Sequence, residues 1–201
     1  MNRMIKLLAA LSVLGATSAH AATVTLTPSQ STTLGNTVVI SLVVSGLGDA
    51  GVSLGTFDLD VQFDAGVLSF DSATFGSGLD VLSLGSLQQV DSSLAGVVNL
   101  FELSIDSIED LNTLQLDAFT LFTLTFNTVG VGTSIVGISP NAFGDAFGVA
   151  LAVDPILQTS VDVAPVPLPA AAWLLMSGLG LLAGAGRRRG LWSAGTAQRL
   201  R

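Results

Sequence analysis

Alternation of apolar and polar side chains is the clearest signal between residues 22 and 163. The stretch LGTFDLDVQFD (54–64) alternates over most of its length, which places its apolar side chains on one face and Asp58, Asp60 and Asp64 on the other. A period of two residues is typical of a half-buried β-strand. Alternation or β-branched content predicts further strands at 23–28, 37–45, 97–105, 119–129, 133–139 and 149–154.

These strand patterns predict an all-β fold. The strands are short, they are joined by Gly, Ser, Asp and Asn, and no sustained period of 3.6 residues interrupts them. Such a chain is expected to form a single antiparallel sandwich over residues 22–163. One short helical turn is predicted at 107–115, where Ser107 and Asp110 have a spacing that resembles a capping box.

Charge divides the chain into three parts. All seven Lys and Arg residues lie near the two ends, and all fifteen acidic residues lie between Asp49 and Asp162. The only histidine is His20, and the chain contains no cysteine or tyrosine. Residues 22–165 therefore carry a formal charge of −15 with no basic side chain.

This composition excludes several classes of function. Nucleic-acid binding needs cations against phosphate. Catalytic triads need His or Cys, and zinc, haem and iron–sulfur sites need nitrogen or sulfur ligands. A glycosidase with two carboxylates remains as an alternative, and Glu102 and Glu109 are its candidate residues. We expect no enzymatic activity, because no cation is present to bind a substrate.

The acidic and aromatic residues suggest two kinds of binding site, each with a structural alternative. Asp58, Asp60 and Asp64 on one strand face, together with Asp145, are candidate calcium ligands, since oxygen ligands are the only ones available. The alternative is a solvated face that keeps a sheet from pairing with other chains. Phe143 and Phe147 are candidate sugar-stacking rings, with core packing as the alternative, and no other cofactor is predicted. The candidate rings lie in the Gly-rich segment 143–151.

The N-terminus has the three parts of a secretory signal peptide. Arg3 and Lys6 precede a short apolar run, and Ala19 and Ala21 form an A-x-A cleavage site. The apolar run is shorter than the roughly 17 residues needed to span a bilayer. We therefore predict that residues 1–21 are a signal peptide and that the mature chain is exported.

The C-terminal region predicts a membrane segment. Residues 170–186 are uncharged and would form about 25 Å of helix, near the lower limit for a hydrocarbon core about 30 Å thick. Arg187, Arg188 and Arg189 follow, and the positive-inside rule keeps them and the basic tail 187–201 in the cytoplasm. A buried core helix and a permanent anchor are the alternative interpretations of this segment.

A more specific interpretation comes from the residues before the span. The linker 164–169 contains Pro167 and Pro169, which hold the chain extended. The order of a VPLPA motif, an apolar span containing Trp and an arginine cluster resembles the PEP-CTERM sorting signal over residues 165–190. The residues of the motif are Val166, Pro167, Leu168, Pro169 and Ala170.

The PEP-CTERM resemblance implies a route through the cell. It implies recognition by a membrane-embedded exosortase, cleavage near the proline motif, and release from an inner-membrane precursor. The product would reach the cell surface or the extracellular matrix of a Gram-negative bacterium that makes exopolysaccharide. Eleven residues follow Gly190, where tails of that family usually end sooner. Exosortase, exopolysaccharide and surface proteins are thus the expected partners.

The body resembles cohesin-type modules. FDLDVQFDAGVLSFDSATFG (57–76) has a strand, a turn at residues 64–66 and then an apolar segment, in the order of the cohesin pattern. Residues 121–139 and 143–151 are similar to later segments of that family, although Ala65 stands where the family usually has proline. The resemblance implies a nine-stranded jelly-roll sandwich used for binding, related to carbohydrate-binding modules. Dockerin recognition does not follow from it.

Together these features predict a non-enzymatic exported protein, sorted to the surface or the biofilm matrix, with one cohesin-like binding or structural domain. Two alternatives stay open. In the first, the tail is never cut and the protein is a membrane-anchored periplasmic module that binds a protein. In the second, the domain acts on glycans.

Overall fold

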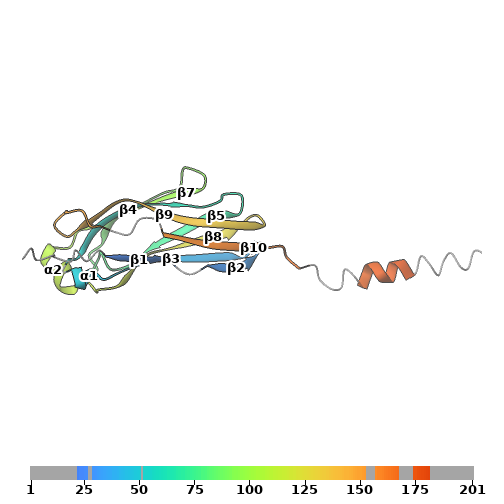
Figure 1. Cartoon of the computed structure of the whole chain (residues 1–201), viewed down its shortest axis with the longest axis horizontal. Coiled ribbons are helices and arrows are strands. Elements are labelled where there is room, and N and C mark those ends of the chain that lie inside the picture. Colours follow the sequence, from blue (N-terminus) through green and yellow to red (C-terminus); the bar gives the residue numbers. More distant parts are fainter. Residues whose placement is uncertain (1–21, 27–28, 51, 153–156, 168–173, 182–201) are drawn as a thin grey trace, which may run out of the picture. The chain divides into compact units, whose positions relative to one another are not determined.

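The computed structural model describes residues 22–26, 29–50, 52–152, 157–167 and 174–181 (Figure 1). The chain divides into two units, Met1–Ala164 and Pro165–Arg201. The strands belong to the first unit and a helical segment at 174–181 belongs to the second. Each unit is described by itself.

The first unit is a sandwich of two sheets (Figure 1). The four-stranded sheet has the order β1 (Thr23–Leu26), β3 (Thr37–Ser45), β8 (Phe119–Thr128) and β5 (Leu68–Phe75). The six-stranded sheet has the order β2 (Gln30–Thr33), β10 (Leu157–Ala164), β9 (Gly132–Asp145), β4 (Leu54–Gln62), β7 (Val97–Ser104) and β6 (Ser86–Asp91). The predicted all-β sandwich is confirmed.

Two short helices, α1 (Leu47–Ala50) and α2 (Ile108–Leu114), lie at the same end of the sandwich (Figure 1). The helical turn predicted at 107–115 is confirmed as α2. Ser107 is its N-cap, and its hydroxyl accepts a hydrogen bond of 3.1 Å from the backbone N–H of Asp110. This bond satisfies one of the N–H groups that a helix start leaves without a partner.

The alternating sequence pattern determines which side chains are buried. In β4 every second side chain from Phe57 to Val61 is buried, and the residues between them face outward. In β3 the same alternation buries Val38, Ile40, Leu42 and Val44. Successive side chains of a strand point to opposite faces, so each strand supplies one apolar face to the space between the sheets.

Phe57 joins the two sheets at the centre of the core. Its ring centroid lies 6.0 Å from that of Phe122 on β8, 6.2 Å from that of Phe75 on β5 and 6.3 Å from that of Phe143 on β9. Phe57 and Phe122 are fully buried. The aromatic residues of the body thus act mainly as shared core between the sheets.

The structure corrects the predicted strand at 149–154. Within the described residues of this range only an isolated bridge forms, between Gly144 and Ala150. The physical reason is a turn closed by Asp145, whose carboxylate accepts hydrogen bonds from the backbone N–H groups of Phe147 (2.9 Å) and Val149 (2.8 Å). The chain doubles back there, and the apolar segment is used in a loop.

The number and direction of strands also differ from expectation. The described residues form ten strands, and β2 pairs with β10 in parallel, so the sandwich is not antiparallel throughout. The strands β2, β5, β6 and β10 were not among the strands that the pattern predicted. The sequence of β6, SLQQVD, carries no clear alternation because five of its six residues are exposed.

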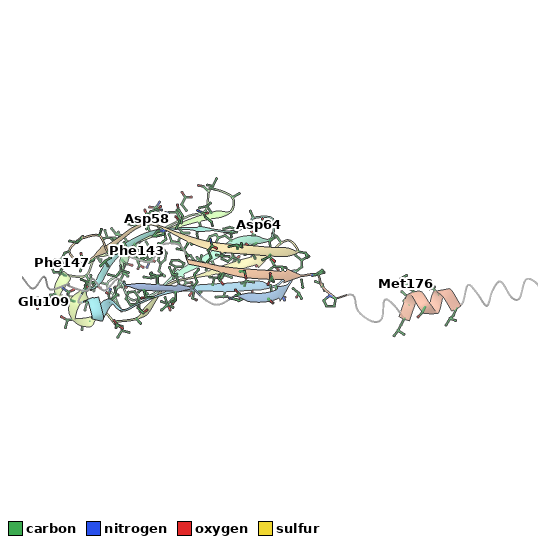
Figure 2. All side chains as sticks on the ribbon, viewed as in Figure 1. Asp58, Asp64, Glu109, Phe143, Phe147 and Met176 are labelled. Atoms are coloured by element: carbon green, nitrogen blue, oxygen red, sulfur yellow. The ribbon has the colours of Figure 1, made fainter. Side chains whose placement is uncertain are left out.

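In the second unit, residues 174–181 form a helix whose large apolar side chains are exposed (Figure 2). These residues lie within the predicted span 170–186, and the rest of that span is outside the described residues. Among the described residues, no helix is long and apolar enough to cross a membrane. The predicted span stays a prediction, as do the signal peptide 1–21 and the tail 187–201, which lie outside the described residues.

Candidate binding face

The outer face of the six-stranded sheet carries the acidic residues of the alternating strand. Asp58 and Asp60 point outward from β4, the strand between β9 and β7. The register places Asn99 of β7 directly beside Asp60. A register shift in β9 next to Asp58 leaves Asn141 exposed at the same level of the sheet. Three neighbouring strands thus contribute polar side chains to one spot.

Hydrogen bonds connect these side chains into a network. The amide nitrogen of Asn99 lies 2.7 Å from a carboxylate oxygen of Asp58 and 2.9 Å from one of Asp60. The amide nitrogen of Asn141 lies 3.2 Å from the same oxygen of Asp58. Donation by the amides offsets the repulsion between two carboxylates on one face. Asn99 therefore holds both acids in a fixed arrangement.

Apolar side chains border this polar network toward β6. Phe101 lies opposite Asp58 in the register and is partly exposed, and Leu103 is next on the same face of β7. Leu87 of β6 lies opposite Leu103 and is exposed. The face therefore combines fixed carboxylates and amides with exposed apolar groups, a mixture typical of protein interfaces.

The four candidate calcium ligands do not come together. Asp58 and Asp60 are neighbours on β4, whereas Asp64 lies beyond the end of that strand and away from Asp58 (Figure 2). Asp145 is nearly buried at the end of β9. In the described part of the chain, no three acidic or histidine side chains are grouped as a metal ion would require.

Asp64 and Asp145 have local structural roles. The carboxylate of Asp64 accepts a hydrogen bond of 2.7 Å from the backbone N–H of Gly66, and its carbonyl accepts one of 3.0 Å from Val67. These bonds form the turn expected at 64–66. Asp145 closes the turn before Val149 in the same way. Calcium takes six to eight oxygen ligands, so the Asp58–Asp60 pair alone fits it poorly, and calcium binding stays a prediction.

Glu102 is the acidic residue that the strand pattern did not single out as interior. It points inward from β7, and its side chain is fully buried. One carboxylate oxygen accepts hydrogen bonds from the hydroxyl of Ser86 (2.6 Å) and from the amide of Gln88 (3.0 Å). The other oxygen is buried without a protein partner. Its position in the alternation, after Val98 and Leu100, was a sequence signal for this burial.

The burial of Glu102 changes its acidity. Loss of hydration raises the pKa of Glu102 above its ordinary value, although the hydrogen bonds from Ser86 and Gln88 act in the opposite direction. The negative charge of Asp80 raises it further. Glu109, the second candidate carboxylate of a glycosidase, is exposed in the first turn of α2 (Figure 2). The two acids therefore do not face a common open cleft.

The two candidate sugar-stacking rings are separated by burial. Phe143 is 6% exposed and contacts Phe57, so core packing, which was the favoured interpretation of this residue, is confirmed, and Phe143 is not a surface ring. Phe147 is 65% exposed in the turn after β9 (Figure 2). A single exposed ring does not form a stacking platform.

Three surface hollows of 210 to 220 Å³ are smaller than the roughly 300 Å³ at which small-molecule sites usually begin.

The residues of the sorting motif are described only in part. Val166 and Pro167 are exposed, in a segment that is neither helix nor strand. Leu168, Pro169 and Ala170 lie outside the described residues. So do the arginines at 187–189 and the predicted cleavage site at Ala19 and Ala21. These sequence predictions therefore stay predictions.

The outer face of the four-stranded sheet contrasts with the face around Asp58. Its residues are mostly Thr, Ser and Val, and Asp71 is the only acid among its four strands. The register aligns Ser41, Thr123 and Thr74 in one row across three strands. The hydroxyl oxygens of Ser41 and Thr123 lie 3.0 Å apart.

No family model matches the sequence, and no curated protein matches it either. Solved structures do match. The sixth cohesin of scaffoldin B from Acetivibrio cellulolyticus, solved in complex with a Cel5 dockerin, has a TM-score of 0.57 and 18% identity. The match covers 72% of this chain and 100% of that cohesin. The domain has a cohesin-like fold.

Two further solved structures support this likeness. The OlpA cohesin of Clostridium thermocellum, in complex with a dockerin, has a TM-score of 0.53 and 10% identity, and the match covers 72% of this chain and 100% of that chain. A type II cohesin domain from the cellulosome of Acetivibrio cellulolyticus has a TM-score of 0.53 and 16% identity. That match covers 69% of this chain and 94% of that one. Cohesins of both types thus share the fold of this sandwich.

Proposed function

We propose that this protein is a non-enzymatic binding module of an exported protein, and that its sandwich binds a protein partner through the outer face of the six-stranded sheet. The observation that carries the proposal is the cohesin-like fold together with the network of Asp58, Asp60 and Asn99 on that face. Two of the cohesins named above were solved with dockerins, which are protein partners. The identity of the partner of this chain is not implied by them.

The charge of this face indicates the chemistry of the partner. The outward acids of the sheet are Asp58, Asp60, Asp91 and Asp162, and residues 22–165 contain no basic residue to neutralise them. A partner that presents Lys or Arg side chains would complement this charge and associate faster at low salt. The exposed apolar groups near Leu87 would supply the desolvated part of the interface.

The binding proposal is tested by capture with a face-specific control. The tagged full chain is cross-linked in the exported fraction of its source cells, and captured proteins are identified by mass spectrometry. Replacing Asp58 and Asp60 with Lys should abolish capture of a partner that Thr125→Lys still captures, because Thr125 lies on the four-stranded sheet. A partner lost equally from both variants, or from neither, would contradict the proposed face.

We further propose that a PEP-CTERM signal delivers the domain to the cell surface or matrix through an exosortase. The exposure of Val166 and Pro167 outside any helix or strand supports this, because a processing enzyme needs an accessible chain segment. Intact mass of the protein recovered from culture medium tests it. A mass that ends near Ala170 is expected, whereas a mass that retains Arg187–Arg189 would favour the permanently anchored alternative, in which the same domain binds its partner at the membrane.

A further inference from the structure

The edge strand β6 is exposed along its free edge and on both of its faces. Among the described strands it pairs only with β7, and none of them pairs with its other edge. Leu87, on the outer face of the sheet, is 57% exposed. Val90 lies opposite the inward-facing Leu100, yet it is 40% exposed, because no element of the described structure covers the inner face at this position. The strand therefore exposes apolar side chains on both faces beside an open row of backbone groups.

The other edge strands are protected against pairing. β1 (Thr23–Leu26) and β2 (Gln30–Thr33) have only four residues each, and β5 (Leu68–Phe75) has a register shift next to the charged Asp71. Short length, irregularity and charge are the usual means by which proteins prevent edge pairing. β6 pairs with β7 over six residues without a register shift or a proline, and its single charge lies at its last residue.

The strand is also held rigid from within the molecule. Ser86 and Gln88 both donate hydrogen bonds to the buried carboxylate of Glu102 on β7. An edge strand that is already ordered loses little conformational entropy when another strand joins it. Glu102 therefore keeps β6 ordered for pairing, and the remaining side chains of β6 are available to contact a partner.

We propose that β6 pairs antiparallel with β6 of a second copy of this chain, joining two six-stranded sheets into one continuous sheet. The hydrogen-bonding row of an antiparallel edge is complementary to itself under a two-fold axis, and two-fold dimers are the commonest oligomers. Since facing side chains must lie on the same face of the sheet, the two-fold axis must place one residue opposite its own copy. The midpoint of β6 falls between Gln88 and Gln89, so one of these two is the central residue.

Charge favours a second copy at this edge. Residues 81–90 contain no ionisable side chain, although the body as a whole carries a formal charge of −15. Two acidic bodies can meet here without placing carboxylates against each other. In a pairing centred on Gln88, Asp91 lies near Gly85 of the second copy, and the two Leu87 side chains are diagonal neighbours across the axis. Diagonal apolar neighbours contribute to strand pairing.

The absence of cysteine from this chain allows a direct test. Gln88→Cys and Gln89→Cys are made separately in the full chain, purified in a mild detergent and oxidised. Directly opposed residues of an antiparallel pair have Cα atoms about 4.5–5.5 Å apart, within the range that a disulfide bridges. One of the two variants should form a covalent dimer, and the one that does so identifies the centre of the pairing. Thr125→Cys, on the opposite sheet, is the control.

A second measurement keeps the proposal independent of side effects at Glu102. Sedimentation of the unmodified full chain should show a monomer–dimer equilibrium, and Leu87→Asp should raise the dimer dissociation constant by about tenfold or more. If Leu87→Asp fails to fold, Gln89→Glu is the milder variant, because Glu has nearly the size of Gln and adds only a charge to the edge.

Three outcomes overturn the proposal. The first is a monomer at every concentration. The second is a dimer whose dissociation constant is changed by neither Leu87→Asp nor Gln89→Glu. The third is cross-linking by Thr125→Cys as strong as that by the β6 cysteine variants. A dimer that forms only through another face gives the second or the third of these. The test uses purified protein alone, so its failure is distinct from failure to capture a separate partner through Asp58 and Asp60.

Discussion

The outer faces of the two sheets differ in charge although their inner faces share one core. The six-stranded sheet presents Asp58, Asp60, Asp91 and Asp162 outward, and the four-stranded sheet presents rows of Thr and Ser with Asp71 alone. Both inner faces are apolar and meet around Phe57. The core thus requires the inward side chains of each strand to be apolar, whereas the outward side chains can differ in charge between the two sheets.

The two faces also differ in how firmly their polar side chains are held. Asn99 fixes Asp58 and Asp60 through bonds of 2.7 and 2.9 Å. On the other face, Ser41 and Thr123 lie 3.0 Å apart in a row that carries no charge. A charged and ordered face is suited to selective recognition, because unpaired charges exclude wrong partners. A neutral hydroxyl face has less to distinguish one partner from another.

The largest expected change in the free energy of unfolding comes from a substitution in the core that the two sheets share. Phe57→Ala removes a fully buried ring that contacts both sheets, and it should lower the free energy of unfolding by about 3–5 kcal/mol. Denaturant unfolding followed by circular dichroism measures this. Phe147→Ala is the matched control, because its ring is exposed, and it should change the free energy by no more than about 0.5 kcal/mol. Equal effects would contradict the assignment of Phe57 to the core.

The second prediction concerns Glu102, the acid on the inner face of the six-stranded sheet. Burial raises its folded-state pKa above the ordinary value, so the folded protein binds this proton more tightly than the unfolded chain does. The stability from this group is complete below the ordinary glutamate pKa of about 4.3 and is lost as pH rises through the raised folded-state pKa. Glu102→Gln should remove this loss, so its stability relative to the unmodified protein should rise from acidic to neutral pH.

The measurement is the difference in unfolding free energy between Glu102→Gln and the unmodified protein from acidic to neutral pH. The difference should grow with pH. Repulsion among the other acids also grows with pH, so Glu109→Gln, which alters an exposed acid, is the control and should show a smaller change. A difference that stays constant or shrinks as pH rises would contradict the raised pKa of Glu102.

The smallest expected effect is on the neutral face. Thr123→Val keeps the shape of the side chain and removes its hydroxyl contact with Ser41, so the free energy of unfolding should fall by about 0.5–1 kcal/mol at most. The change should not depend on salt, because no charged group is involved. A salt-dependent loss in this variant would mean that the two faces are less distinct than their composition indicates.

Much of the fold was predictable because burial follows alternation. The pattern of 54–64 predicted a strand with Phe57 inward and Asp58 and Asp60 outward, and the Ser107–Asp110 spacing predicted the N-cap of α2. The predicted strand at 149–154 does not form over its described residues 149–152, because the Asp145 turn competed with strand pairing for the same backbone groups. β6 was missed, because a strand exposed on both faces has no alternation to detect.

The sequence by itself determined which side chains the alternating strands turn inward, where acids and bases lie along the chain, and which catalytic and metal chemistries the body excludes. These are local or compositional properties. Only the tertiary structure decided that β6 ends a sheet with an open edge, that Asn99 bridges Asp58 and Asp60, and that Glu102 lacks a protein partner for one oxygen. The reason is physical: each of these features depends on which distant strands pair and in which register, and alternation within one strand carries no information about that.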